Sequence, residues 1–176
     1  MMNDAGLRMS VVAAIAAVTA GLVAGCTSNP DADEVAEALP DLSGQSLEQL
    51  DCEDSVVWGG TLETVTAPYV EECWTGSPDE PFYDTADAIL TEITDATGAE
   101  DVSDDVCPED ALYDSAAVAC RAAVKGEVMI RVAVALTQPA VAVGNLPDQP
   151  TEEQIDQAVS GQAVDVWLGT QPLPES

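Results

Sequence analysis

The chain has 176 residues and holds 33 Asp and Glu against 4 Lys and Arg, which gives a formal net charge of −29 at pH 7. A charge of this sign and size opposes binding to nucleic acids and to anionic lipid headgroups, because both are negatively charged. Histidine is absent, which excludes Ser-His-Asp and Cys-His catalysis, His-ligated zinc sites and pH sensing by histidine.

The N-terminal segment has the pattern of an export signal. An apolar run of about 14 residues extends from position 11 to position 24, which fits the hydrophobic region of a signal peptide and is shorter than the ~20 residues of a membrane span. The run ends in the segment Leu22-Val23-Ala24-Gly25-Cys26. This segment resembles a bacterial lipobox, the motif at which a signal peptidase cuts before a cysteine that carries a diacylglycerol.

The resemblance implies that residues 1–25 are a lipoprotein signal peptide and that Cys26 is lipidated. Two acyl chains would then hold the protein stably at the outer face of the plasma membrane. The start of the segment has only Arg8 as a cation, with Asp4 nearby, so a plain secretory peptide and an uncleaved anchor stay open as alternatives. In composition and cysteine number the chain is similar to small lipoproteins of high-GC Gram-positive (actinobacterial) bacteria, whereas the mature domain resembles no family.

The mature chain is predicted to contain a tether, one domain and a short tail. Residues 26–45 are polar and acidic, which is typical of a flexible, solvated tether. Residues 46–171 are long enough for a single domain with its own core. Residues 172–176 contain two prolines and are predicted to be frayed.

The first half of the domain predicts a hairpin and then a helix. Residues 55–66 contain two β-rich runs around Gly59 and Gly60, which favours a hairpin. The helix is predicted from Asp84, as its N-cap, to Gly98, as its C-terminal stop. Its apolar residues recur at helical spacing and predict one buried stripe, made of Ala86, Ile89, Leu90 and Ile93.

The best structural signal is a pair of β-runs, residues 116–123 and 127–136, around a three-residue loop that ends in glycine. We predict a register that pairs Ala122 with Val128, because it leaves one face entirely apolar. A two-residue turn would instead place Arg121 among large aliphatic side chains and desolvate its charge. Small residues on the first run and large ones on the second predict a helix packed across the first run.

The C-terminal part predicts a short helix and a last strand. Thr151 and Gln154 form a capping-box pair that opens the helix, and Gly161 ends it. Residues 163–168 alternate between apolar and other side chains, as in a strand. The predicted fold class is therefore α+β, with a small antiparallel sheet and two short helices, stapled by two disulfides.

Five cysteines occur, and lipidation of Cys26 leaves four of them. An even number of cysteines in an exported domain predicts two disulfides. Four cysteines permit three pairings, and we favour Cys52–Cys73 and Cys107–Cys120 because sequence neighbours close short loops. The alternative is a metal site, which is disfavoured because no C-x-x-C pair and no histidine is present.

An acidic loop over residues 98–110 is the candidate metal site. Its carboxylates supply oxygen ligands at short spacing, as calcium prefers, although the EF-hand pattern is not met. The alternative is a solvated loop held by a disulfide. The candidate calcium ligands are Asp101, Asp104, Asp105 and Glu109.

Cations and tryptophans are the other candidate binding groups. The three cations of the mature chain lie between Arg121 and Arg131, and the predicted register puts them on the outer face of the hairpin. They could form an anion site, but ion pairing with the many carboxylates is the favoured interpretation. Trp58, Trp74 and Trp167 could hold a glycan or a partner, but filling of the core is favoured.

Three functions remain, and we favour the first. It is a non-enzymatic lipoprotein, anchored through its N-terminal acyl chains, that binds an unidentified protein or envelope component. The second is a module that binds calcium or a small ligand through the acidic loop. The third is a carboxylate-dependent hydrolase, which needs only two well-placed carboxyl groups, although so many acidic residues make chance pairs inevitable.

Overall fold

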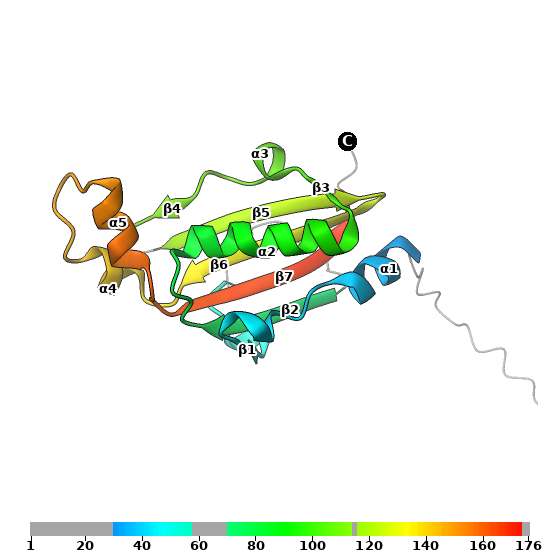
Figure 1. Cartoon of the computed structure of the whole chain (residues 1–176), viewed down its shortest axis with the longest axis horizontal. Coiled ribbons are helices and arrows are strands. Elements are labelled where there is room, and N and C mark those ends of the chain that lie inside the picture. The colour runs from blue at the N-terminus through cyan, green and yellow to red at the C-terminus, as the bar shows by residue number, and fades with distance from the viewer. Residues whose placement is uncertain (1–29, 58–69, 114–115, 174–176) are drawn as a thin grey trace, which may run out of the picture.

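The computed structural model describes residues 30–57, 70–113 and 116–173 (Figure 1). The α-helices of this part are α1 (Pro30–Ala38), α2 (Phe82–Thr97), α3 (Ser103–Val106), α4 (Pro139–Val143) and α5 (Glu152–Val159). The strands are β1 (Leu47–Leu50), β2 (Val70–Gly76), β3 (Glu100–Asp101), β4 (Ala111–Leu112), β5 (Ala117–Lys125), β6 (Val128–Leu136) and β7 (Val164–Pro172). Two 3₁₀ turns, η1 (Leu42–Gln45) and η2 (Cys52–Asp54), flank β1.

The strands form one antiparallel sheet in the order β1-β2-β7-β6-β5-β3, and β4 also pairs with β5. The predicted α+β class and antiparallel sheet are therefore confirmed. With seven strands the sheet is larger than predicted. Strands β1, β2, β3 and β4 were not among the predicted strands. Strands β3 and β4 have two residues each, too short to show a periodic pattern in the sequence.

One face of the sheet packs against α2, which lies across β5 and β6 (Figure 1). The predicted apolar stripe of α2 is confirmed, since all four of its residues are buried in the main core. Small side chains on β5 allow α2 to approach the sheet, as predicted, whereas β6 contributes large ones. The β5 residues in this core are Ala117, Ala119 and Ala123, and those of β6 are Val128, Ile130, Val132 and Val134.

The predicted ends of the helices are partly confirmed. Helix α2 starts earlier than predicted, because Phe82 is buried at its first turn and Pro81, not Asp84, precedes the helix without a side-chain cap. Gly98 ends it in the left-handed conformation, at φ 68°. The capping box of Thr151 opens α5 as predicted.

The register between β5 and β6 differs from the predicted one. Ala122 pairs with Arg131 instead of Val128, and the hairpin closes through a two-residue turn whose Gly126 has a φ of 59°. A glycine with positive φ is typical of such turns. Arg121 therefore lies on the face that packs against α2, and its charge is compensated there by carboxylates.

The prediction of a tether over residues 26–45 is wrong from Pro30 onward, and residues 26–29 lie outside the described part of the chain. Ala32, Val35 and Leu42 are buried in the main core. Ala32 and Val35 are three residues apart on one side of α1, and Leu42 is the buried residue of η1, so α1 and η1 belong to the domain.

The predicted tail also begins too early. Pro172 is the last residue of β7 and pairs with Val128, and the N–H of Leu173 donates to the carbonyl of Glu127 at 3.0 Å. The predicted final strand is thus confirmed and extends beyond residue 168. Residues 174–176 lie outside the described part.

Both predicted disulfides are confirmed. The Cys52–Cys73 bond joins η2 to β2, and the Cys107–Cys120 bond joins the segment after α3 to β5. The first bond lies on the sheet face opposite α2, where a second core contains Trp167.

The tryptophans lie in both cores. Trp74 is buried on the α2 side of the sheet and Trp167 on the other, which confirms the core interpretation for these two. Trp58 lies outside the described residues, as does most of the hairpin predicted over residues 55–66.

The place of α1 in the core can be tested with Val35→Ala. Val35 is fully buried, at 0 % exposure, so removing two methyl groups is expected to lower the free energy of unfolding by about 2 kcal/mol in urea denaturation. The control is Val141→Ala in α4, where the valine is 58 % exposed and the expected change is below about 0.5 kcal/mol. Equal effects of the two substitutions would contradict a packed α1.

Candidate functional site: an acidic cavity around Arg121

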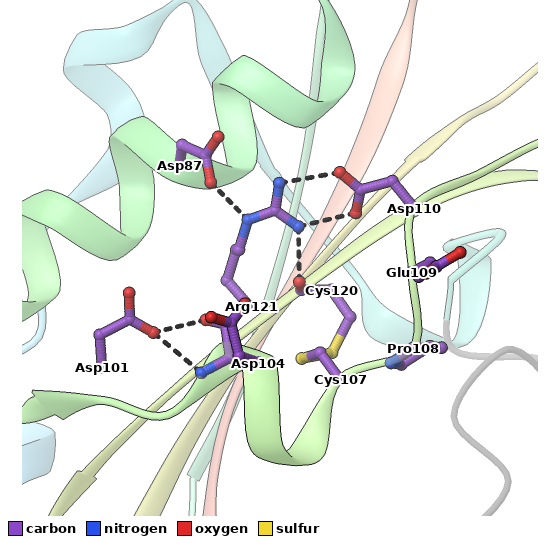
Figure 2. A pocket seen from close by; sticks show the side chains of 10 residues that line it. Asp87, Asp101, Asp104, Cys107, Pro108, Glu109, Asp110, Cys120 and Arg121 are labelled. Carbon is purple, nitrogen blue, oxygen red and sulfur yellow. Dashed lines mark hydrogen bonds and ion pairs between the residues drawn. A yellow bond between two sulfur atoms is a disulfide. The ribbon is translucent and has the colours of Figure 1, made fainter.

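The candidate site lies at the edge of the sheet, beside the middle of β5. Strand β3 pairs with Ala123 and Val124, and β4 pairs with Ala117 and Val118. Between these two short pairings, residues 102–110 bulge away from β5 and carry α3 and one half of a disulfide (Figure 2).

The bulge borders an open cavity of about 550 Å³ beside α2. Its wall is dominated by acidic side chains, and one cation is present. The lining residues are Asp87, Asp101, Ser103, Asp104, Cys107, Pro108, Glu109, Asp110, Cys120 and Arg121.

Two contacts tie the bulge to the backbone of β5. The N–H of Val102 donates to the carbonyl of Ala122 at 2.9 Å, and the N–H of Ala122 donates to the Ser103 hydroxyl at 3.0 Å. These bonds satisfy β5 backbone groups that lie between the β3 and β4 pairings. The disulfide to Cys120 then holds the far end of the bulge.

Arg121 is the central cation of the cavity (Figure 2). Its Nη1 and Nη2 donate to the two carboxylate oxygens of Asp110 at 2.7 and 2.9 Å. Its Nε pairs with Asp87 of α2, and Nη1 also donates to the Cys120 carbonyl at 2.7 Å. The guanidinium group thus donates through Nε on one side and through Nη1 and Nη2 on the other. Its contact with Asp110 is bidentate, which is the stronger kind of charged hydrogen bond.

The exposed fractions of the paired side chains indicate how strongly these ion pairs act. The Arg121 side chain is 14 % exposed, whereas Asp110 and Asp87 are 32 % and 59 % exposed. Hydrogen bonding to Asp110, and then to Asp87, raises the pKa of Arg121 above its ordinary value and outweighs the opposite effect of desolvation. Arg121 therefore keeps its charge and connects β5, α2 and the end of the bulge.

Asp101 shapes the start of α3. Its carboxylate accepts from the Ser103 hydroxyl at 2.7 Å and from the Ser103 N–H at 2.9 Å. The hydroxyl bond is the main reason why the pKa of Asp101 lies below its ordinary value. A general acid requires the opposite shift, so this carboxylate does not favour the hydrolase alternative.

The four predicted calcium ligands are only partly brought together. Asp101, Asp104 and Glu109 line the cavity, whereas Asp105 does not. Within the described ranges, no three Asp, Glu or Cys side chains are grouped closely enough to hold a metal ion. Calcium binding therefore stays a prediction from sequence, without support from the geometry of these residues.

Sequence reasoning missed two residues of the site, Asp87 and Asp110. Asp87 falls in the first turn of the helix predicted from Asp84 to Gly98, outside its apolar stripe. Because α2 starts at Phe82, Asp87 lies beyond the first turn and faces Arg121 instead. Ion pairing, the favoured interpretation for the cations, is confirmed for Arg121 and for Lys125, which pairs with Glu34 at 3.1 Å.

Arg121→Met tests whether the guanidinium holds the site together. The substitution keeps an aliphatic chain but leaves Asp87 and Asp110 without their cation, so unfolding free energy should fall by about 2 kcal/mol. Lys125→Met, on the same strand, removes a more exposed pair and should cost less than about 1 kcal/mol. Chemical denaturation measures both values, and a larger loss for Lys125→Met would contradict the central role of Arg121.

None of the helices in the described part of the chain is both long and apolar enough to cross a bilayer. Comparisons of the chain with protein-family models, with curated proteins and with solved structures gave no match. Any function must therefore be inferred from the chemistry of the chain and of its surface.

Proposed function

We propose that the protein is a non-enzymatic binding module, lipid-anchored through Cys26 at the outer face of the plasma membrane, and that its acidic cavity receives a positively charged segment of a protein or envelope partner. The observation that carries this proposal is the charge balance of the cavity. Among the described residues that line it, the single cation, Arg121, is already paired with Asp87 and Asp110. Binding of a cation is the chemistry that the remaining carboxylates favour.

The carboxylates available to a partner are Asp104 and Glu109. Both line the cavity and both are exposed, and neither pairs with a cation of the described residues. The net charge of −29 adds a long-range attraction that speeds the approach of a basic partner and falls with added salt. Lysine and arginine side chains of a partner therefore fit this cavity better than a neutral or anionic ligand.

Binding of a short lysine-rich peptide to the full chain tests this proposal. The double variant D104N/E109Q should weaken binding about fivefold at low salt, because it removes two exposed charge pairs, and the difference should shrink as sodium chloride is added. Isothermal titration calorimetry measures both effects.

A matched control separates the cavity from the overall charge. E48Q/E53Q also removes two exposed carboxylates, at β1 and η2, and β1 is the strand at the opposite edge of the sheet from β3. It should leave peptide affinity nearly unchanged. Equal losses in the two double variants would show that only net charge attracts the peptide and would reject the cavity as the site.

The anchor has its own test. Cys26→Ser removes the sulfur that would carry the diacylglycerol, so the protein should move from the membrane fraction to the soluble fraction of cells that express it. Immunoblotting of the two fractions measures the shift. Cys52→Ser, which removes a disulfide cysteine instead, should leave the protein in the membrane fraction. Retention of Cys26→Ser in the membrane would mean that a different feature anchors the chain.

A further inference from the structure

The bulge, residues 102–110, has no part in either core. None of its residues is buried, and α3 within it has no buried residue. Val102 and Val106 are half-buried, but neither belongs to a core or to the side chains that pack against one. A segment with so few buried apolar contacts opens at a low cost in free energy while the rest of a domain stays folded.

Non-covalent contacts hold only the two ends of the bulge. At its start the bulge bonds the backbone of β5, and at its end Asp110 pairs with Arg121. Between these ends, the hydrogen bonds that residues 104–109 form with described residues stay inside the bulge. Among the described residues, the Cys107–Cys120 disulfide is therefore the one hydrogen bond, ion pair or disulfide that joins residues 104–109 to the sheet.

The two disulfides differ in their surroundings. Cys107 and Cys120 both line the open cavity (Figure 2) and belong to neither core. Cys73, in contrast, is a member of the second core, and Cys52 packs against that core. Cys107 is half-buried whereas Cys120 is 3 % exposed, so a thiol that enters the cavity meets Cys107 first.

We propose that the Cys107–Cys120 disulfide is a redox switch of the acidic cavity. When a dithiol reduces the bond, residues 104–109 separate from β5. The carboxylates of Asp104 and Glu109 then lose their fixed positions beside the cavity, and the affinity for a basic partner falls. The proposal rests on the cation-binding function proposed above, because it describes how binding at that same site is regulated.

The chemical step is a thiol–disulfide exchange. One thiolate of the dithiol attacks the Sγ of Cys107, the S–S bond breaks, and its electron pair leaves with the Sγ of Cys120, which takes up a proton. The second thiolate then attacks the reductant's own sulfur in the mixed disulfide and releases Cys107, which is also protonated. The protein gains two electrons and two protons, and the dithiol becomes a disulfide.

Reduction should leave the rest of the domain folded. Strand β5 keeps its pairing with β6 and its packing against α2. Arg121 keeps both of its carboxylate partners, because Asp87 lies in α2 and Asp110 directly precedes β4, which stays paired with β5. The change is therefore confined to the bulge.

Hydrogen exchange tests the structural part of the proposal. The full chain is reduced with dithiothreitol, and alkylation followed by mass spectrometry should find Cys107 and Cys120 before Cys52 and Cys73. The amide hydrogens of Asp105 and Cys107, which bond inside the bulge, should then exchange at least about tenfold faster, while those of α2 stay protected. Earlier reduction of the other disulfide, or unchanged exchange in the bulge, would overturn the proposal.

Calorimetry with the short lysine-rich peptide tests the regulation. Reduction of the native chain should weaken binding about fivefold, which is the effect expected of D104N/E109Q. In D104N/E109Q itself, reduction should change the affinity less than about twofold, because the side chains that it displaces are already neutral. Additive losses would show that the disulfide acts elsewhere and would overturn the proposal.

The variant C107A/C120A is the matched control, since it lacks this bond and keeps Cys52–Cys73. It should bind the peptide about as weakly as the reduced native chain and should not respond to dithiothreitol. A further loss on reduction would assign the effect to the other disulfide, and native affinity in the variant would also contradict the switch. Near-UV circular dichroism verifies folding, and the reduced native chain gives the same comparison without any substitution.

Failure of the proposed function would give a different result. If the oxidised native chain does not bind the peptide, the cavity is not a cation site, and regulation of binding by the disulfide is rejected with it. If the oxidised chain binds the peptide and reduction leaves the affinity unchanged, the cavity remains a cation site and only the redox switch is rejected.

Discussion

The ion pairs of Arg121 constrain how several elements of the fold are placed relative to one another. A cation on the sheet face that packs against a helix is costly unless carboxylates reach it. Asp87 reaches it from α2 and Asp110 from the bulge after α3. The hairpin register, the position of α2 and the path of residues 102–110 must therefore agree with one another. The open acidic cavity is the space left between these elements.

Local signals in the sequence predicted the parts of the fold that local chemistry determines. The stripe of α2 and the capping box of α5 depend on residues close together in the chain, whereas the disulfides followed from pairing sequence neighbours among only four cysteines. The predicted register of β5 and β6 was wrong, because it was chosen to keep the charge of Arg121 from being buried without a partner. Its partners are 11 and 34 residues away, and no periodic pattern reveals contacts of that kind. The short strands β3 and β4 were not predicted, because two residues are too few to show a periodic pattern.

The candidate sites also combine features that the sequence predicted with contacts between residues that are distant in the chain. Composition alone pointed to the acidic loop, yet Asp105 stays outside the cavity while Asp87 and Asp110, assigned no binding role, complete it. Ion pairing followed from the large excess of carboxylates, and it holds for Arg121 and Lys125. Among the described residues, Arg131 has no ion-pair partner, and its cross-strand neighbours are alanine and glycine. Register, rather than composition, decides which charges find partners.

Inclusion of α1 in the core changes the geometry of the proposed anchor. Only three residues separate Cys26 from Pro30, so a fully extended connection reaches at most about 14 Å. Helix α1 also contacts the β5–β6 turn, where Lys125 bonds Glu34, and α4 and α5 lie at the other end of the sheet (Figure 1). With this proposed anchor, the domain would have the tip of its β5–β6 hairpin toward the bilayer, and α4 and α5 would lie at the end farther from it.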